Sequence, residues 1–344
     1  MFEGIEKLAA MAIVFAPAYV IFAYVWSRTS QTVTRHQLLI GVSAGVGSIF
    51  IDIILGISAW FFAFATRQEP LISALILALP GSGMNEEIAK ALICSHLIFN
   101  SKKFKEPGEI LILCVLIGFG FALYENIGYL SLSKDIIGVA YLRALTATMM
   151  HMSLAVLMGV AAIHASRTHK FVPFVAVVAG QILLHGAYNF PLLYANALSK
   201  AGSSFPPQLL LANGVVLIAC VVLAIIALNM TDLHAETNPN RTNYNLAIFF
   251  GGFILVIISF VTAAMLKVRP LEDELLGASP LYSYLALCGP PFILGLEMIF
   301  NILRAPSSNK TRPVIAMHQS TTLRPLRTGD AQESFGRRRT YPGA

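Results

Sequence analysis

Nine long apolar stretches constrain what this chain can fold into more than any other feature of its sequence. Each is long enough to cross a hydrocarbon core of about 30 Å as a helix of roughly 20 residues. They cover residues 8–26, 38–62, 71–99, 109–133, 137–165, 171–195, 208–228, 246–266 and 281–303. Only helices and closed barrels satisfy their backbone hydrogen bonds inside lipid, and these stretches lack the apolar-polar alternation of barrel strands. The sequence therefore predicts an all-α membrane protein, a polytopic bundle of about nine transmembrane helices.

Charged residues are scarce and unevenly spread. Asp, Glu, Lys and Arg make up 12% of the 344 residues, about half of their share in soluble domains, which excludes a soluble globular protein. The net charge of +6 resides in residues 304–344, where eight Lys and Arg face two acids. We expect this stretch to be a disordered basic tail that follows a transmembrane domain at residues 1–303. Because the positive charge belongs to the tail, no nucleic acid partner is expected.

The basic residues between the predicted helices indicate an orientation in the membrane. Alternate connections, counted together with the tail, hold sixteen Lys and Arg on one side and six on the other. Cytoplasmic loops collect basic residues, so the N-terminus is expected outside and the tail in the cytoplasm. We expect a multi-pass protein of the plasma membrane, embedded in the lipid bilayer.

Nine ionisable residues lie deep inside the predicted helices. They are Asp52, Glu86, Glu87, Lys90, Glu125, Arg143, His151, His185 and Glu297. A charge at the centre of a membrane helix costs about 2.5 to 3.5 kcal/mol on insertion scales. Several such residues together therefore indicate a polar interior site. Asp52 and Glu297 have no comparable companions, and for these two a packing or water-cavity role is expected.

Residues 86–90 read EEIAK and lie about midway along the predicted third helix. Helical spacing places Glu86 and Glu87 four and three residues before Lys90, so its ammonium group can neutralise either carboxylate. Two carboxylates then share one cation, and one of them is available as a general base. A proline and two glycines within residues 80–83 can break the helix and open the site to water.

The next three predicted helices bring further polar residues. They are Phe121, Glu125 and Asn126 in the fourth helix, Arg143 and His151 in the fifth, and His185 and Asn189 in the sixth. Counted from the outer ends of the helices, the acids and histidines lie 8 to 15 residues deep, or roughly 12 to 23 Å. They can therefore meet between the midplane of the membrane and its outer leaflet.

At these residues the sequence resembles the PrsW family of intramembrane proteases, within the wider superfamily of CAAX prenyl endopeptidases. Four motifs match in order along residues 71–195: EExxK, FxxxEN, a lone histidine with a later glycine, and HxxxN. They are carried by Glu86, Glu87 and Lys90, by Phe121, Glu125 and Asn126, by His151 with Gly159, and by His185 with Asn189. The resemblance implies hydrolysis of a peptide bond in a membrane-anchored protein substrate, within the membrane or at its edge.

The resemblance leaves two mechanisms open. The CAAX relatives have a histidine at the position of Glu125, so this chain offers carboxylates and two imidazoles, a set suited to one Zn²⁺ with an open position for water. We favour this alternative, with Glu125, His151 and His185 as ligands. In the metal-free alternative, one acid of the EEIAK motif activates water directly, while His185 and Asn189 bind the developing oxyanion.

Roles for the individual residues follow from the resemblance. Catalytic roles are expected for Glu86, Glu87, Lys90, Glu125, Asn126, His185 and Asn189, and substrate binding for Arg143. The main alternative function is an ion- or proton-coupled transporter that uses the same buried residues. A transporter predicts symmetry between the two halves of the chain, whereas the polar residues crowd into the third to sixth helices. We therefore favour an enzyme.

Overall fold

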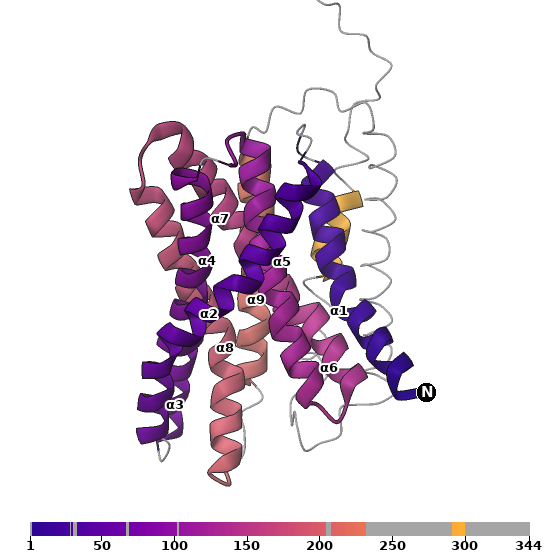
Figure 1. Cartoon of the computed structure of the whole chain (residues 1–344). Helices are drawn as coiled ribbons and strands as arrows, with labels where there is room; N and C mark the ends of the chain where they lie inside the picture. The colour runs from indigo at the N-terminus through magenta and orange to yellow at the C-terminus, as the bar shows by residue number, and fades with distance from the viewer. Residues whose placement is uncertain are drawn as a thin grey trace, which may run out of the picture. The chain divides into compact units, whose positions relative to one another are not determined.

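The computed structural model describes most of the first two thirds of the chain and one short stretch near residue 295. The described residues are 2–27, 29, 33–66, 69–101, 103–203, 208–231 and 291–299. By its contacts the chain divides into two units, Met1–Ala305 and Pro306–Ala344, and the second unit lies outside the described residues. Every regular element in the described part of the first unit is a helix (Figure 1), as the sequence predicts.

The helices follow one another through short connections, with η marking π-helical segments. They are α1 (Phe2–Ser27), α2 (Arg35–Ala65), α3 (Pro70–Ile76), η1 (Leu77–Met84), α4 (Asn85–Ser95), η2 (His96–Asn100), α5 (Pro107–Leu132), α6 (Ile136–Arg143), η3 (Ala144–Thr148), α7 (Met149–Thr168), α8 (Val172–Lys200) and α9 (Gln208–Met230). Residues 291–299 are also helical.

Six helical stretches among the described residues are long and apolar enough to cross a membrane. They are Glu6–Ser27, Arg35–Phe64, Pro107–Leu132, Ile136–Thr168, Val172–Lys200 and Ala212–Met230. Each coincides with one of the nine predicted helices. The protein is therefore a multi-pass helical membrane protein.

The other three predicted helices are not confirmed as spans. The third is helical from Pro70 to Asn100, but it is not among the six, because the charged EEIAK motif at its centre lowers its hydropathy. The eighth lies outside the described residues, as does the predicted tail at 304–344, and only residues 291–299 of the ninth are described.

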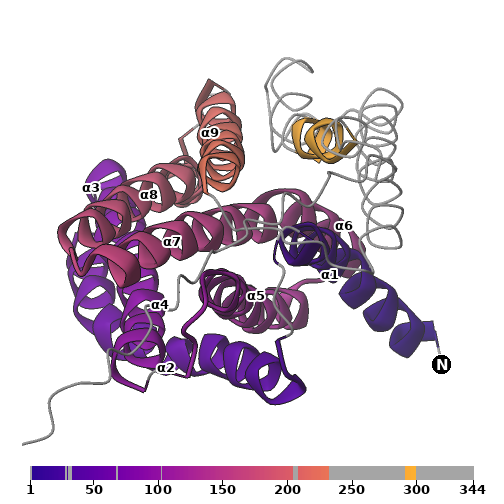
Figure 2. The same ribbon diagram turned by 90° about the horizontal axis from the view of Figure 1, so that it is seen from above.

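The centre of the bundle is formed by α5 and by the stretch from α6 to α7. Within an apolar stretch of 18 residues, 72% of the residues of α5 are buried, and 89% of those between α6 and α7 are buried. In α2 the corresponding share is 22%. Helix α7 lies between α5 on one side and α8 and α9 on the other (Figure 2). Helix α2 packs against α5 but exposes a ridge that includes Phe50, Ile54 and Trp60, which are 68–70% exposed. A large exposed apolar surface of this kind indicates contact with lipid.

Glycines let the helices around the polar residues approach closely. A Cβ atom on Gly120 of α5 would collide with the backbone oxygen of Val42 in α2, and one on Gly83 of η1 would collide with the backbone oxygen of Ile182 in α8. Small residues at such contacts are typical of packed membrane helices. These contacts hold α5 against α2, and η1, which leads into α4, against α8, which sets the spacing of the site.

Candidate active site and metal centre

The four predicted motifs meet in the interior of the bundle. The EExxK motif begins α4, FxxxEN lies on α5, and the two histidines come from α7 and α8. Helix α7 contacts α5 and α8, and α8 contacts α4. Arg143 at the end of α6 completes the set. The side chain of Glu125 is 24% exposed, and the other charged side chains and imidazoles of the site are at most 11% exposed. The site is thus buried, with one more open edge at Glu125.

Glu87 organises the part of the site that lies between α4 and α8. Its Oε1 atom accepts a hydrogen bond from Lys90 Nζ at 2.6 Å and lies 2.7 Å from His185 Nδ1. An ionised carboxylate only accepts hydrogen bonds, so His185 Nδ1 carries the proton and a neutral ring keeps the lone pair on Nε2. That Nε2 atom lies 3.6 Å from Oε2 of Glu86. Glu87 therefore aims the free nitrogen of His185 at the neighbouring acid.

Glu125 organises the part of the site that lies between α5, α6 and α7. Its Oε2 atom lies 2.8 Å from His151 Nε2 and 2.9 Å from a terminal nitrogen of Arg143. Arg143 also donates from Nε to Asn126 Oδ1, and Asn126 donates to the hydroxyl of Thr148 at 2.9 Å. The guanidinium carbon of Arg143 lies 3.9 Å from the centre of the Tyr129 ring. These contacts fix the orientation of both Arg143 and His151.

The two parts of the site meet at Lys90 and His151. Lys90 Nζ lies 3.3 Å from His151 Nδ1 and 4.5 Å from the centre of the Phe121 ring. The rings of His151 and His185 are edge-to-face, with centroids 5.2 Å apart. The phenylalanine of FxxxEN thus packs under the lysine of EExxK, a cation–π contact between the two motifs.

Three buried residues could hold a metal ion. Glu86, His151 and His185 each offer one ligand atom, and these atoms lie within 4.8 Å of one another. Oε2 of Glu86 is buried and has no hydrogen-bond partner among the described residues. Two imidazoles and a carboxylate match the three protein ligands of many catalytic zinc sites. Glu125, which the sequence places among the ligands, lies outside this group and instead contacts His151 and Arg143.

Some residues singled out in the sequence are not joined to this network by hydrogen bonds. Asn189 is half-buried one turn after His185, and its side chain makes no hydrogen bond within the described part of the chain. Asp52 of α2 is half-buried and interacts electrostatically with Lys90 and Glu125. It therefore has polar companions that its position in the sequence does not reveal.

The sequence patterns did not single out three further polar residues near the site. Asn85 is buried directly before Glu86, with its side-chain oxygen unpaired in the described structure. Thr148 binds Asn126, and Gln181 donates to the backbone oxygen of Leu154 at 2.6 Å. Gln181 precedes His185 by four residues, so helical spacing could have placed it on the face of that histidine.

Two π-helical segments flank the site. Segment η1 contains the predicted helix breakers and ends one residue before α4, and η3 separates Arg143 from α7. Such segments occur frequently at functional sites, because they change the direction of side chains within an otherwise continuous helix. Here each segment directly precedes or follows residues of the site.

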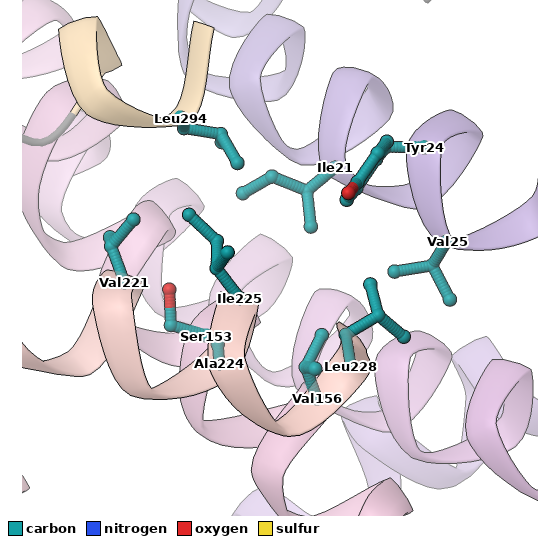
Figure 3. Close-up of a pocket in the computed structure, with 10 residues that line it drawn as sticks. All are labelled: Ile21, Tyr24, Val25, Ser153, Val156, Val221, Ala224, Ile225, Leu228 and Leu294. Carbon is teal, nitrogen blue, oxygen red and sulfur yellow. The ribbon is translucent and has the colours of Figure 1, made fainter. Parts of the chain in front are cut away.

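A small cavity lies elsewhere, between α1, α7, α9 and residues 291–299. Its volume is about 20 Å³, and its lining includes Ile21, Val221, Leu228 and Leu294 (Figure 3). A space of this size holds about one water molecule, and an apolar one stays dry. None of the residues of the site lines this cavity.

Comparison with known proteins identifies the family of the chain. The sequence model of the family described as PrsW family intramembrane metalloprotease matches residues 33–228, which include every residue of the site. No curated protein and no solved structure matches the chain. The matched segment covers more than half of the 344 residues. The chain therefore belongs to the PrsW family of intramembrane metalloproteases, and it is a peptide hydrolase that acts on a protein substrate.

Proposed function

We propose that this protease cleaves a membrane-anchored protein substrate with water that is activated between α4, α7 and α8. The observation that carries the proposal is the group of Glu86, His151 and His185, whose ligand atoms lie within 4.8 Å of one another. A buried carboxylate oxygen without a hydrogen-bond partner is costly. A bound cation offsets that cost at Glu86.

We infer that Glu86, His151 and His185 hold one zinc ion, and Glu86 replaces Glu125 in the ligand set expected from the sequence. When bound, zinc supplies Lewis-acid polarisation of a carbonyl oxygen and an activated water at its open position. His185 is ready for this role because Glu87 fixes its protonated nitrogen. Ligation by His151 through Nδ1 requires Lys90 to release its 3.3 Å contact, while Lys90 keeps Glu87 at 2.6 Å.

Glu87 is the residue best placed to move the proton. Its Oε1 atom is occupied by Lys90 and His185, whereas its Oε2 atom is buried and has no hydrogen-bond partner in the described structure. We propose that this oxygen accepts a proton from the attacking water and returns it to the leaving amine, as a general base and acid does. Lys90 holds Glu87 in place through the hydrogen bond at 2.6 Å.

Glu125, Asn126 and Arg143 act around this centre. Glu125 orients His151 in the way that carboxylates commonly orient metal-binding histidines. Arg143 lies at the more exposed edge of the site, beside the Tyr129 ring, and we propose that it binds the substrate backbone there. Asn189 has a free amide one turn after His185 and is proposed as a donor to the developing oxyanion.

The metal-free alternative assigns water activation to Glu86 or Glu87 alone, with His185 and Asn189 as oxyanion donors. Both mechanisms need the same carboxylates, so they differ in metal dependence and not in geometry. The description of the family as metalloproteases supports the zinc mechanism. No observation among the described residues favours the transporter alternative.

The proposed orientation places the N-terminus outside the plasma membrane and the tail in the cytoplasm. Its support is the distribution of sixteen against six basic residues between the two sides. A cysteine introduced by Ser320→Cys should react with an impermeant thiol reagent only from the cytoplasmic side. Reaction from outside in sealed cells would reverse the proposed topology.

One reconstitution experiment tests the proposed reaction. The wild-type protein in proteoliposomes should cleave a membrane-anchored peptide, and Glu86→Gln and Glu87→Gln should each abolish cleavage while the protein still inserts and folds. Glutamine keeps the shape of glutamate and loses its basicity. Near wild-type cleavage by both variants would refute the catalytic assignment.

A further inference from the structure

Cys94 of α4 and Cys114 of α5 form a buried thiol pair on the far side of Lys90 from the acids. Their Sγ atoms are 2.9 Å apart, and both residues are 0% exposed. Both are free thiols in the structure. The sulfur atoms of a disulfide are about 2.05 Å apart, so the two atoms need to approach each other by less than about 1 Å to form the bond.

This thiol pair lies on the same faces of α4 and α5 as the contact between Lys90 and Phe121. Cys94 follows Lys90 by four residues, or about one helical turn, and Cys114 precedes Phe121 by seven residues, or about two turns. Lys90 Nζ itself lies 4.5 Å from the centre of the Phe121 ring. The two pairs are therefore neighbouring contacts between the same two helices.

We propose that Cys94 and Cys114 are an oxidative modification site, which a hydroperoxide closes into a disulfide that fixes α4 against α5 and lowers proteolysis reversibly. One thiol gives up its proton as its sulfur attacks an oxygen of the hydroperoxide. The O–O bond breaks, the sulfur becomes a sulfenic acid, and the other oxygen takes up the proton and leaves as an alcohol or water. The second thiol then attacks the sulfenic sulfur, and water leaves. Two thiols and one hydroperoxide thus become one disulfide, one alcohol (water when the oxidant is hydrogen peroxide) and one further water.

Burial determines which reagents reach the pair and why the bond affects the site. Bulky thiol reagents are excluded from two fully buried sulfur atoms, whereas hydrogen peroxide is small enough to enter during packing fluctuations. Packed interiors transmit small displacements, and a shift of about 1 Å in a catalytic group can reduce the rate about a hundredfold. The effect on proteolysis rests on the proposed function, but formation of the bond does not.

Peptide mapping after oxidation tests the proposal directly. Trypsin cuts at the lysines between the two cysteines, which separates residues 91–102 from residues 106–134. After hydrogen peroxide treatment and alkylation of remaining thiols, mass spectrometry should find these two peptides joined, and a reductant should separate them. Cleavage of the membrane-anchored peptide should fall about tenfold or more and recover on reduction.

Variants distinguish this bond from general oxidative damage. Cys94→Ala should remove both the joined peptides and the reversible loss of cleavage, and Cys114→Ser should do the same if the first variant folds poorly. Cys220→Ala, which changes a buried cysteine of α9, should behave like the wild type. Failure to find joined peptides in the folded wild type overturns the proposal, as does an equal peroxide effect in Cys94→Ala. If the wild type shows no proteolysis at all, the joined peptides and a higher unfolding temperature of the oxidised protein still test the pair.

Discussion

The two parts of the site differ in how completely they are sealed. Between α4 and α8, Glu87 and Lys90 are at most 2% exposed, yet Oε2 of Glu86 and of Glu87 remain without hydrogen-bond partners in the described structure. Between α5 and α7, Glu125 is 24% exposed, and its Oε2 atom contacts both Arg143 and His151. The sealed part thus keeps carboxylate oxygens that are free to accept a proton or bind a metal. In the open part, the polar atoms bind one another and fix the orientation of the side chains.

The largest expected effect is a loss of peptide cleavage when an acid of the sealed part is replaced. Glu86→Gln should reduce peptide cleavage by a factor on the order of a thousand or more, because it removes an unpaired carboxylate of the sealed part, which is also a proposed metal ligand. Steady-state cleavage rates and the metal content of the purified variant measure this. A variant that retains both its metal and its activity would place the chemistry elsewhere.

A stability measurement sharpens the same comparison. Lys90→Met should lower the free energy of unfolding by about 3 to 5 kcal/mol, because it leaves the fully buried carboxylate of Glu87 without its cation. Thermal unfolding in detergent or lipid reports the change. The double variant Lys90→Met with Glu87→Gln should recover most of the lost stability, since no charge is then stranded, and no recovery would mean that Lys90 stabilises the fold in another way.

The open part should tolerate substitution better. Glu125→Gln should reduce cleavage by about ten- to a hundredfold through loosened binding of metal by His151, with a smaller loss of stability than Lys90→Met because Glu125 is partly exposed. Metal titration of this variant should show weaker binding at unchanged stoichiometry. A complete loss of metal would instead make Glu125 a ligand, as the sequence alone suggests.

The smallest expected effect concerns α2. Asp52→Asn removes a half-buried charge that interacts with Lys90 and Glu125, but Lys90 keeps its hydrogen bond to Glu87. We expect cleavage to change by less than about fivefold, the size of a weak ion-pair interaction. A much larger loss would assign Asp52 to the site itself.

The features that follow from one helix at a time were predictable from the sequence. The long apolar windows predict an all-helical membrane protein, and the spacing of three residues predicts contact between Glu87 and Lys90, which lie 2.6 Å apart. Counting residues from the helix ends also predicts that the acids and histidines reach similar depth. Each of these inferences needs only helix geometry and the thickness of a bilayer.

The features that depend on how helices rotate against one another were not predictable. Glu86, and not Glu125, offers a carboxylate oxygen within 4.8 Å of ligand atoms of both histidines, because rotation about α4 and the pairing of Glu125 with Arg143 decide which acid stays free. The contact between Cys94 and Cys114 likewise depends on the register of two helices. The sequence predicts nine transmembrane helices, whereas the described residues contain six candidate spans.

The central claim is that the group of Glu86, His151 and His185 holds a catalytic zinc ion. Measuring the metal content and the cleavage activity of the same preparation tests this claim most directly. The purified wild type should contain about one zinc per chain, cleavage should stop with a chelator and return with added zinc, and His185→Ala should lose both metal and cleavage. A metal-free wild-type preparation that still cleaves the membrane-anchored peptide at the full rate would contradict the claim and assign water activation to the glutamates alone.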